Sequence, residues 1–352
     1  VDPYNSFWRS AMDHIEQSDG TMDAFQIDAS KVFPEIDWLG ALQFGYRYAD
    51  RDQTARFSTY NWGSLSEIWG NGGPIWLDEE VNGSVPGNVE PYYFKGFMDG
   101  KVKDPLGGEG RLFYADNTVD NYDEAVAYAL NIANAWGGSW VPLAGRPDVI
   151  PGTPFLPGEI NPVREKNNAA YVKLEFEHAL DNGWEISGNI GLRYTDTNRT
   201  ASGFESYAFQ EFTSEEECNE PLPPGQEKSA WCSLDPSIRQ EARDFSNGAS
   251  VATNYELDYD YWLPSVNALL RTGGDWQFRA SYFEGVAPPE FGLTRAYFPV
   301  TLSTQEEDIE AGGGRPIARI SAGNPDLLPV DSKNFDVTAE WYFADVGQLT
   351  LA

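Results

Sequence analysis

The stretch from Asn168 to Thr200 constrains the fold more than any other part of this sequence. On its first arm apolar side chains alternate with polar ones, the apolar set being Val172, Leu174 and Phe176. On its second arm the residues that share one face are Trp184, Ile186, Ile190, Leu192 and Tyr194. Asn182-Gly183 joins the arms, and both residue types tolerate the positive φ of a tight hairpin turn. A period of two on both arms predicts a long β-hairpin with one apolar and one polar face.

Two environments suit such a hairpin. It can lie in a sandwich sheet in water, or in a barrel wall with lipid outside and a wet lumen inside. Five further stretches show the same alternation and are predicted strands: Phe25–Ala29, Trp38–Phe57, Thr253–Arg271, Trp276–Tyr282 and Phe335–Phe343. With the two hairpin arms and a last strand that stops at Leu349–Ala352, the sequence predicts eight strands. Because the last strand is unfinished and Val1 is not an initiator Met, we expect a piece of a longer protein.

Three long segments without alternation separate these strands, at about 58–161, 203–248 and 288–332. They alternate with tight turns along the chain. In an up-and-down meander every second connection lies at the same end, so the long loops share one rim. Short turns at one rim and long loops at the other are the pattern of outer-membrane barrels, with the short turns facing the periplasm.

Two helices are expected outside the strands. In the first long segment, a helix is predicted from a cap at Asp120 to a stop at Gly137. Near the start, a short helix over Phe7–Ile15 would present Phe7, Ala11 and Ile15 on one face.

Four tryptophans stand beside tight turns. Trp38, Trp184 and Trp276 each follow a turn by one residue, and Trp341 stands just before one. Large amphipathic rings at a common height are typical of the aromatic girdle at a membrane interface. We therefore expect these four side chains to lie at the lipid boundary.

The amino-acid composition of the chain excludes several classes of protein. The chain has 55 acidic and 24 basic residues, a net charge of -31, which argues against binding nucleic acid. Aromatic residues make up 14%, too many for a disordered acidic chain. No apolar run reaches about 18 residues, which excludes a transmembrane helix but not a barrel, whose strands are only half apolar.

Several motifs resemble the barrel of TonB-dependent outer-membrane receptors. The stretches that carry the resemblance are Tyr261–Asn267, Asp275–Ser281, Gly323–Pro329, Glu165–Tyr171 and Gly188–Thr197, with weaker similarity over Met22–Asp52. One departure is visible, because Ala287-Pro288-Pro289 stands where the family often has Ala-Arg-Pro. Whatever that arginine does in the family is not carried over to this chain.

The resemblance implies an antiparallel transmembrane β-barrel, plugged and 22-stranded, of which residues 1–352 form a part. The plug, the TonB-contacting box and the terminal strands are absent from this sequence. The implied location is the outer membrane of a Gram-negative bacterium, in contact with its lipid. The implied activity is import of a scarce ligand, energised by the TonB-ExbB-ExbD complex through the N-terminal part.

The sequence indicates the ligand only weakly. Aromatic faces stack on sugar rings, and the first long segment is rich in them: Trp62, Trp69, Trp76, Tyr92, Tyr93, Trp136 and Trp140. They favour an oligosaccharide or glycoconjugate, although the same rings could pack the loop onto itself. Arg295, Arg315 and Arg319 could hold an anionic ferric siderophore, but the acidity of the chain opposes this. Cobalamin and a peptide remain alternatives.

The sequence gives little support for a catalytic site or a metal site. With only His14 and His178, no Ser-His or metal-ligand spacing emerges, so we expect no enzyme and no cofactor, except that loop carboxylates could hold calcium. Cys218 and Cys232 suit a disulfide worth about 3 kcal/mol in the chain-entropy model. The alternative from another class is a soluble β-sandwich, either a carbohydrate-binding module or a hydrolase, which would need no detergent.

Overall fold

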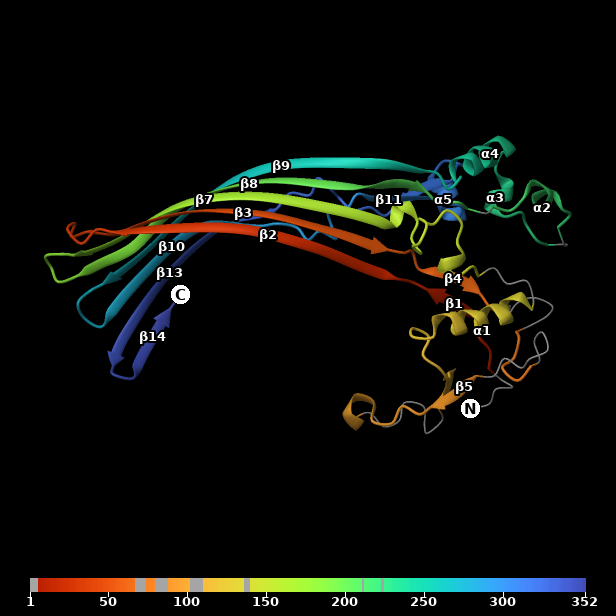
Figure 1. The fold of residues 1–352 in the computed structure, drawn as a ribbon, viewed down its shortest axis with the longest axis horizontal. Coiled ribbons are helices and arrows are strands. Elements are labelled where there is room, and N and C mark those ends of the chain that lie inside the picture. The colour runs from red at the N-terminus through yellow and green to blue at the C-terminus, as the bar shows by residue number, and fades with distance from the viewer. Residues whose placement is uncertain are drawn as a thin grey trace. The chain divides into compact units, whose positions relative to one another are not determined.

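The computed structural model describes residues 6–66, 74–79, 88–101, 110–135, 140–210, 212–222 and 225–352 (Figure 1). Its main feature is one long sheet in which sequence neighbours lie side by side, in the order β14-β13-β10-β9-β8-β7-β3-β2. The strands are β2 (Glu16–Val32), β3 (Leu39–Phe57), β7 (Ile160–Ala179), β8 (Glu185–Tyr207), β9 (Ser250–Arg271), β10 (Trp276–Ala287), β13 (Val330–Ala344) and β14 (Gly347–Leu351). The eight predicted strands are confirmed, as is their antiparallel order.

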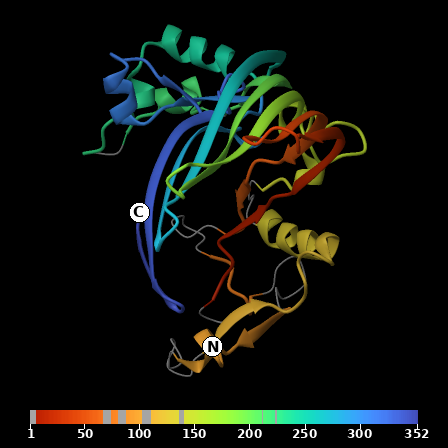
Figure 2. The same ribbon diagram turned by 90° about the vertical axis from the view of Figure 1, so that its left-hand side faces the viewer.

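The sheet is a curved wall (Figure 2). Among the described strands, β2 and β14 are its two free edges and do not pair with each other, so the structure shows a meander and not a closed ring. The strands are long, 23 residues in β8 and 22 in β9, against about 5–6 in ordinary globular proteins. Such lengths fit a membrane-crossing wall better than a sandwich.

The strands extend further toward the long loops than the alternation predicted. The central hairpin covers Ile160–Tyr207 instead of Asn168–Thr200. The connections are therefore residues 58–159, 208–249 and 288–329, named here the first, second and third loops. Near these loops both faces of the strands carry polar residues, which hides the period of two.

The opposite rim has tight turns built on glycine. Gly183 and Gly273 have φ values of 78° and 72°, in the left-handed region that glycine adopts without strain. A Cβ on Gly273 would lie 2.6 Å from the carbonyl oxygen of Gly183, so the two adjacent turns are in contact. The predicted Asn-Gly turn is confirmed.

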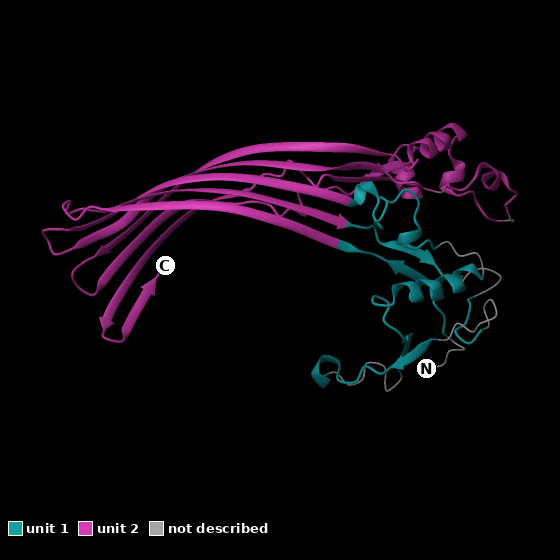
Figure 3. Ribbon diagram, in the orientation of Figure 1, with its two compact units in different colours: residues 1–16, 57–159 teal, residues 17–56, 160–352 magenta. Residues whose placement is uncertain are grey.

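The chain divides into two compact units (Figure 3). Unit 1 comprises Val1–Glu16 and Phe57–Glu159, and unit 2 comprises Gln17–Arg56 and Ile160–Ala352. The elements of unit 1 are β1 (Ser10–Asp13), β4 (Asn61–Ser64), β5 (Val89–Tyr92), η2 (Phe97–Gly100), β6 (Arg111–Tyr114), α1 (Tyr122–Asn134), η3 (Leu143–Gly145) and η4 (Pro157–Glu159). The first loop thus belongs to a unit with its own core.

The two helix predictions fare differently. Helix α1 is confirmed, but its cap is Asn121, while the Asp120 carboxylate accepts a hydrogen bond from Asn117. The helix predicted over Phe7–Ile15 is wrong, because Ser10–Asp13 is strand β1 and pairs with β4. The backbone partners of β1 lie about fifty residues further along the chain, beyond the reach of a local helical pattern.

The second and third loops also contain structure. The second loop holds α2 (Glu215–Asn219), α3 (Ala230–Ser233) and α4 (Pro236–Phe245), and the third holds β11 (Tyr297–Ser303), α5 (Glu306–Ala311) and β12 (Ile317–Ile320). They share a small core of Cys218, Trp231, Leu234, Ala242 and Ile309. Strand β11 pairs in parallel with the end of β8, which ties the third loop to the sheet.

Among the described residues, no helix has the length and apolarity needed to span a membrane.

Candidate functional site

One face of the sheet in unit 2 is an apolar band that crosses its strands. In the strand register Leu42 lies opposite Leu174, which lies opposite Ile190, and Ile190 lies opposite Val266. Ile190 is 52% exposed and Leu192 39%, so no second sheet formed by the described residues covers this face. Apolar surfaces of this extent are not left in contact with water in soluble monomers. The apolar face therefore needs a cover that the described residues do not provide.

Aromatic rings border the apolar band at both heights. Trp276 lies opposite Trp341 and stacks on it with ring centroids 5.6 Å apart, at the level of Trp184 beside the tight turns. At the other border Tyr194 lies opposite Trp262, 4.8 Å away. From Trp184 to Tyr194 the strand advances about 33 Å at about 3.3 Å per residue. With a tilt of about 40° that is a height of about 25 Å, the thickness of a barrel's apolar band.

Beyond the second aromatic row the same face becomes polar. The residues that continue it are Asp196, Asn198, Asp258 and Asp260, and Asn198 donates hydrogen bonds to Glu256 and Asp258. The apolar band thus ends on the side of the long loops. The row of Tyr194 and Trp262 escaped the sequence analysis, although the change from aromatic to acidic residues along β9 marks its position.

The other face of the sheet is polar and forms the wall of a cavity of about 270 Å³. The amide of Asn167 donates to the hydroxyls of both Thr195 and Thr197, at 2.8 and 2.7 Å. Around them the cavity is lined by Arg47, Arg51, Glu165, Tyr259, Tyr261, Pro288 and Pro329, with Met22, Ala49 and Val286. This wall therefore combines amide, hydroxyl and phenol groups with two arginines, one glutamate and several apolar side chains, and the two prolines belong to the third loop.

Arg199 joins the third loop to this polar face. Its guanidinium, 1% exposed, donates to the Glu165 carboxylate at 3.0 and 3.2 Å and to the Tyr259 hydroxyl at 3.0 Å. Its remaining terminal nitrogen donates to the carbonyl oxygen of Leu327 at 2.9 Å. The buried arginine is thus neutralised by Glu165 on β7 and donates one further hydrogen bond to the third loop.

The third loop crosses β8 at contact distance. A Cβ on Gly203 would lie 1.7 Å from the carbonyl oxygen of Ala296, which is 0% exposed. Beside this crossing Phe291 packs with Val163 and Ala201, and its ring centroid lies 3.7 Å from the Arg51 guanidinium. Glycine at 203 is required because any side chain would push the loop off the sheet.

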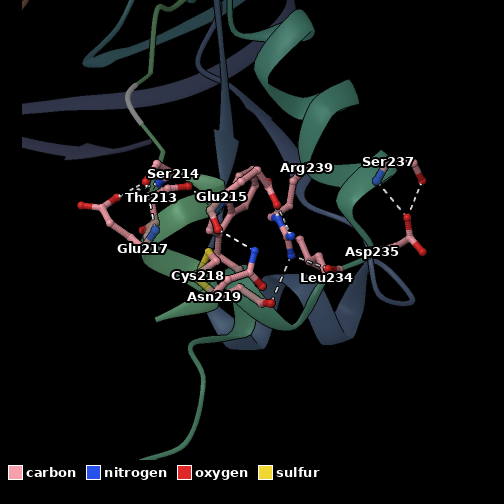
Figure 4. Close-up of polar contacts among 12 residues, drawn as sticks. Thr213, Ser214, Glu215, Glu217, Cys218, Asn219, Leu234, Asp235, Ser237 and Arg239 are labelled. Carbon is pink, nitrogen blue, oxygen red and sulfur yellow. Dashed lines mark hydrogen bonds and ion pairs between the residues drawn. A yellow bond between two sulfur atoms is a disulfide. The ribbon is translucent and has the colours of Figure 1, made fainter. Parts of the chain in front are cut away.

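A second buried arginine organises the second loop (Figure 4). Arg239, 3% exposed, forms a two-pronged ion pair with Glu215 and donates to the carbonyl oxygens of Cys232 and Leu234. The predicted disulfide between Cys218 and Cys232 is confirmed and closes a loop with a sequence separation of 14. The helices of the second loop are therefore held together by one disulfide and by the ion pair of the buried Arg239.

The ion pair of Glu215 with Arg239 makes the stability of the second loop sensitive to acid. Hydrogen bonds from Arg239 and Arg243 lower the pKa of Glu215 to about 2, from a usual 4.5. A lowered folded-state pKa contributes stability above pH 4.5, and that contribution is lost as the pH falls toward 2. We expect Glu215→Gln to flatten the pH dependence of proteolysis within residues 212–245 between pH 4.5 and 2. Glu216→Gln, at an exposed neighbour, should behave as the wild type, and equal profiles for both variants would contradict the assignment.

The arginines predicted in the third loop are already engaged. Arg315 pairs with Glu241 at 2.8 Å, and Arg319 forms a two-pronged pair with Asp308, whose pKa it lowers. Arg295 donates to the carbonyl oxygen of Gly292 and lies over the Tyr297 ring. These contacts leave little positive charge to attract an anionic chelate, so a binding role for the three arginines stays a prediction.

The predicted rings of the first loop do not form one cluster. Trp140 is 6% exposed in the core of unit 1, whereas Trp62 is 66% exposed on β4. Trp76 packs against Phe7, and the exposed Tyr92 and Tyr93 lie near β5. Trp69 and Trp136 lie outside the described residues. Trp140 lines an apolar cavity, and Trp62 lies opposite Met12 of the same cavity wall.

Metal binding receives no support from side-chain clustering. In the described part of the chain no group of three His, Cys, Asp or Glu residues is close enough to hold an ion. Calcium in the acidic loops stays a prediction.

A comparison with models of protein families gives a match. A family model described as "TonB dependent receptor-like, beta-barrel" matches residues 2–352, almost the full chain. A search of curated proteins finds no match.

Proposed function

Since the chain belongs to the family of TonB-dependent receptor β-barrels, we propose that it imports an oligosaccharide or glycoconjugate across the outer membrane of a Gram-negative bacterium. Barrels of this family are outer-membrane transporters and not enzymes. In this proposal the TonB-ExbB-ExbD complex supplies the energy. The sheet of unit 2 is then a segment of barrel wall, and residues 1–352 are part of the proposed 22-stranded barrel.

The exposed apolar face is the observation that carries the transporter assignment. Acyl chains cover such a face at no cost, and the height of about 25 Å matches the apolar band of outer-membrane barrels. Trp38, Trp184, Trp276 and Trp341 are then the girdle on the side of the tight turns, and Tyr194 and Trp262 belong to the opposite girdle. The soluble sandwich is disfavoured because, in the part of the chain that the structure describes, Ile190 and Leu192 have no covering sheet.

The cavity on the polar face of the sheet supports a ligand rich in hydroxyl groups. Its wall offers the amide oxygen of Asn167, whose nitrogen already donates to Thr195 and Thr197, and the rings of Tyr259 and Tyr261, groups that hydrogen-bond to and stack on sugars. An anionic ferric siderophore would need an excess of free positive charge. In the third loop Arg315 and Arg319 are paired with carboxylates. In the cavity wall Arg47 and Arg51 are accompanied by the carboxylate of Glu165. The net charge of -31 would also repel it.

Growth of a strain lacking the intact receptor tests this proposal. We expect slow growth and lost uptake on oligosaccharides as sole carbon source, and normal growth under iron limitation. Complementation with the intact gene is the control. A defect confined to iron limitation would overturn the sugar assignment but leave the transporter class standing. Extraction of the receptor from membranes without detergent would overturn the transporter class itself.

A further inference from the structure

Unit 1 contains a cavity of about 820 Å³ beside helix α1. This volume lies within the range of about 300–1,000 Å³ that is typical of small-molecule sites. Its walls are mainly apolar and aromatic, including Trp8, Tyr114, Val126, Tyr128, Trp140 and Leu143. The cavity is made by unit 1 alone and is separate from the polar cavity on the sheet.

A buried carboxylate lies in this apolar wall. Asp13, 9% exposed, accepts hydrogen bonds from the Tyr122 hydroxyl at 2.6 Å, the Asn61 amide at 2.6 Å and the backbone N–H of Leu143 at 2.8 Å. Burial and this bond to Asp13 raise the pKa of Tyr122, so its hydroxyl keeps the proton it donates. The carboxylate is thereby held rigidly, with room for about one more donor on its two oxygens.

This carboxylate has no cationic partner among the described residues. Every ion pair found there joins other groups. The neighbouring His14, which also lines the cavity, directs Nδ1 to Ser58 and Nε2 to Glu16, both at 3.1 Å, so any positive charge it gains faces Glu16. An unneutralised carboxylate in an apolar wall is costly, and a cation delivered by a ligand would offset that cost.

We propose that this cavity binds an aromatic organic cation, with an ammonium group directed to Asp13 and its ring among the aromatic walls. The aromatic rings of Trp8, Tyr122 and Trp140 line the same cavity and would attract the ammonium group by cation–π interaction, in addition to its attraction to the Asp13 carboxylate. The negative charge of the whole chain raises the local concentration of cations and lowers that of anions. The site is independent of the sugar proposed for the transport path.

Three indole compounds of similar size test the proposal on the intact receptor in detergent, by titration calorimetry. We expect tryptamine, an ammonium ion, to bind at least about ten times more tightly than neutral 3-ethylindole, and indole-3-propionate to bind most weakly. Equal affinities for the three compounds, or no binding of tryptamine, would overturn the proposal. Neither result bears on oligosaccharide uptake.

Two variants place the binding in this cavity. Ala125 lines the cavity on α1, so Ala125→Trp should fill it and abolish tryptamine binding, while Ala127→Trp on the exposed side of the helix should leave it unchanged. Asp13→Asn should bring tryptamine down to the affinity of 3-ethylindole. If Asp13→Asn fails to fold, the two alanine variants still decide, and tryptamine binding to Ala125→Trp at wild-type strength would refute the site.

Discussion

Replacing Arg199 with leucine is expected to release the third loop from the polar face of the sheet. The substitution leaves the Glu165 carboxylate, whose side chain is 14% exposed, without its cation, and leaves the carbonyl of Leu327 without its donor. Removing one partner of a buried ion pair costs about 3–5 kcal/mol. Hydrogen exchange should accelerate over residues 291–297 and 323–329, two segments of the third loop that backbone hydrogen bonds join to each other.

Arg164 provides the matched control for this prediction. Arg164 precedes Glu165 on β7 and forms an ion pair with Asp50, but its side chain is 54% exposed. Exposed ion pairs contribute only about 0–1 kcal/mol to the free energy of unfolding. Arg164→Leu should therefore leave the third loop protected. Adding Glu165→Leu to Arg199→Leu should recover part of the loss, because no uncompensated charge then remains. Identical exchange in wild type and Arg199→Leu would show that the loop is held by its other contacts.

The second large effect is expected from a charge on the apolar face. Ile190 stands near mid-height of the band between Trp184 and Tyr194 and is 52% exposed. If this face meets acyl chains, Ile190→Arg costs about 2–4 kcal/mol, the value for arginine at the midplane of a barrel wall. The loss can be measured by unfolding the intact receptor in lipid vesicles with urea. The folded fraction at each urea concentration is read from electrophoresis of unheated samples, in which the folded barrel migrates differently from the unfolded chain.

Ser187 on the polar face of the same strand gives the control. Its side chain points to the opposite side of β8, so Ser187→Arg should fold and insert almost as the wild type does. The contrast between faces is the test. If Ile190→Arg were tolerated as well as Ser187→Arg, the apolar face would not be in contact with lipid.

Part of the candidate site was accessible from local sequence. The turn at Asn182-Gly183 sets the hairpin register, and that register places Glu165 opposite Arg199. The ion pair could therefore have been found by counting back from the turn, but the sequence analysis did not do so. The four tryptophans beside the turns were identified because a turn and a ring are neighbours in the chain.

Other parts depended on contacts that no local pattern contains. The bond from Arg199 to Leu327 spans 128 residues, and that from Tyr122 to Asp13 spans 109. The pairing of Arg315 could not be recognised in the sequence, since its partner Glu241 lies 74 residues away. The erroneous helix at Phe7–Ile15 has the same origin, because β4 supplies the backbone partners of β1 from across the unit.

The strands, their order and their two unlike faces follow directly from the order of residues along this chain. The physical reason is that each strand meets two different environments, which impose a period of two on every segment independently. The arrangement of the loops was decided only in three dimensions. There, Asp13 and the last donor contact of Arg199 found hydrogen-bond partners in chain segments more than about a hundred residues away, such as Tyr122 and Leu327, and no local pattern in the sequence marks those partners.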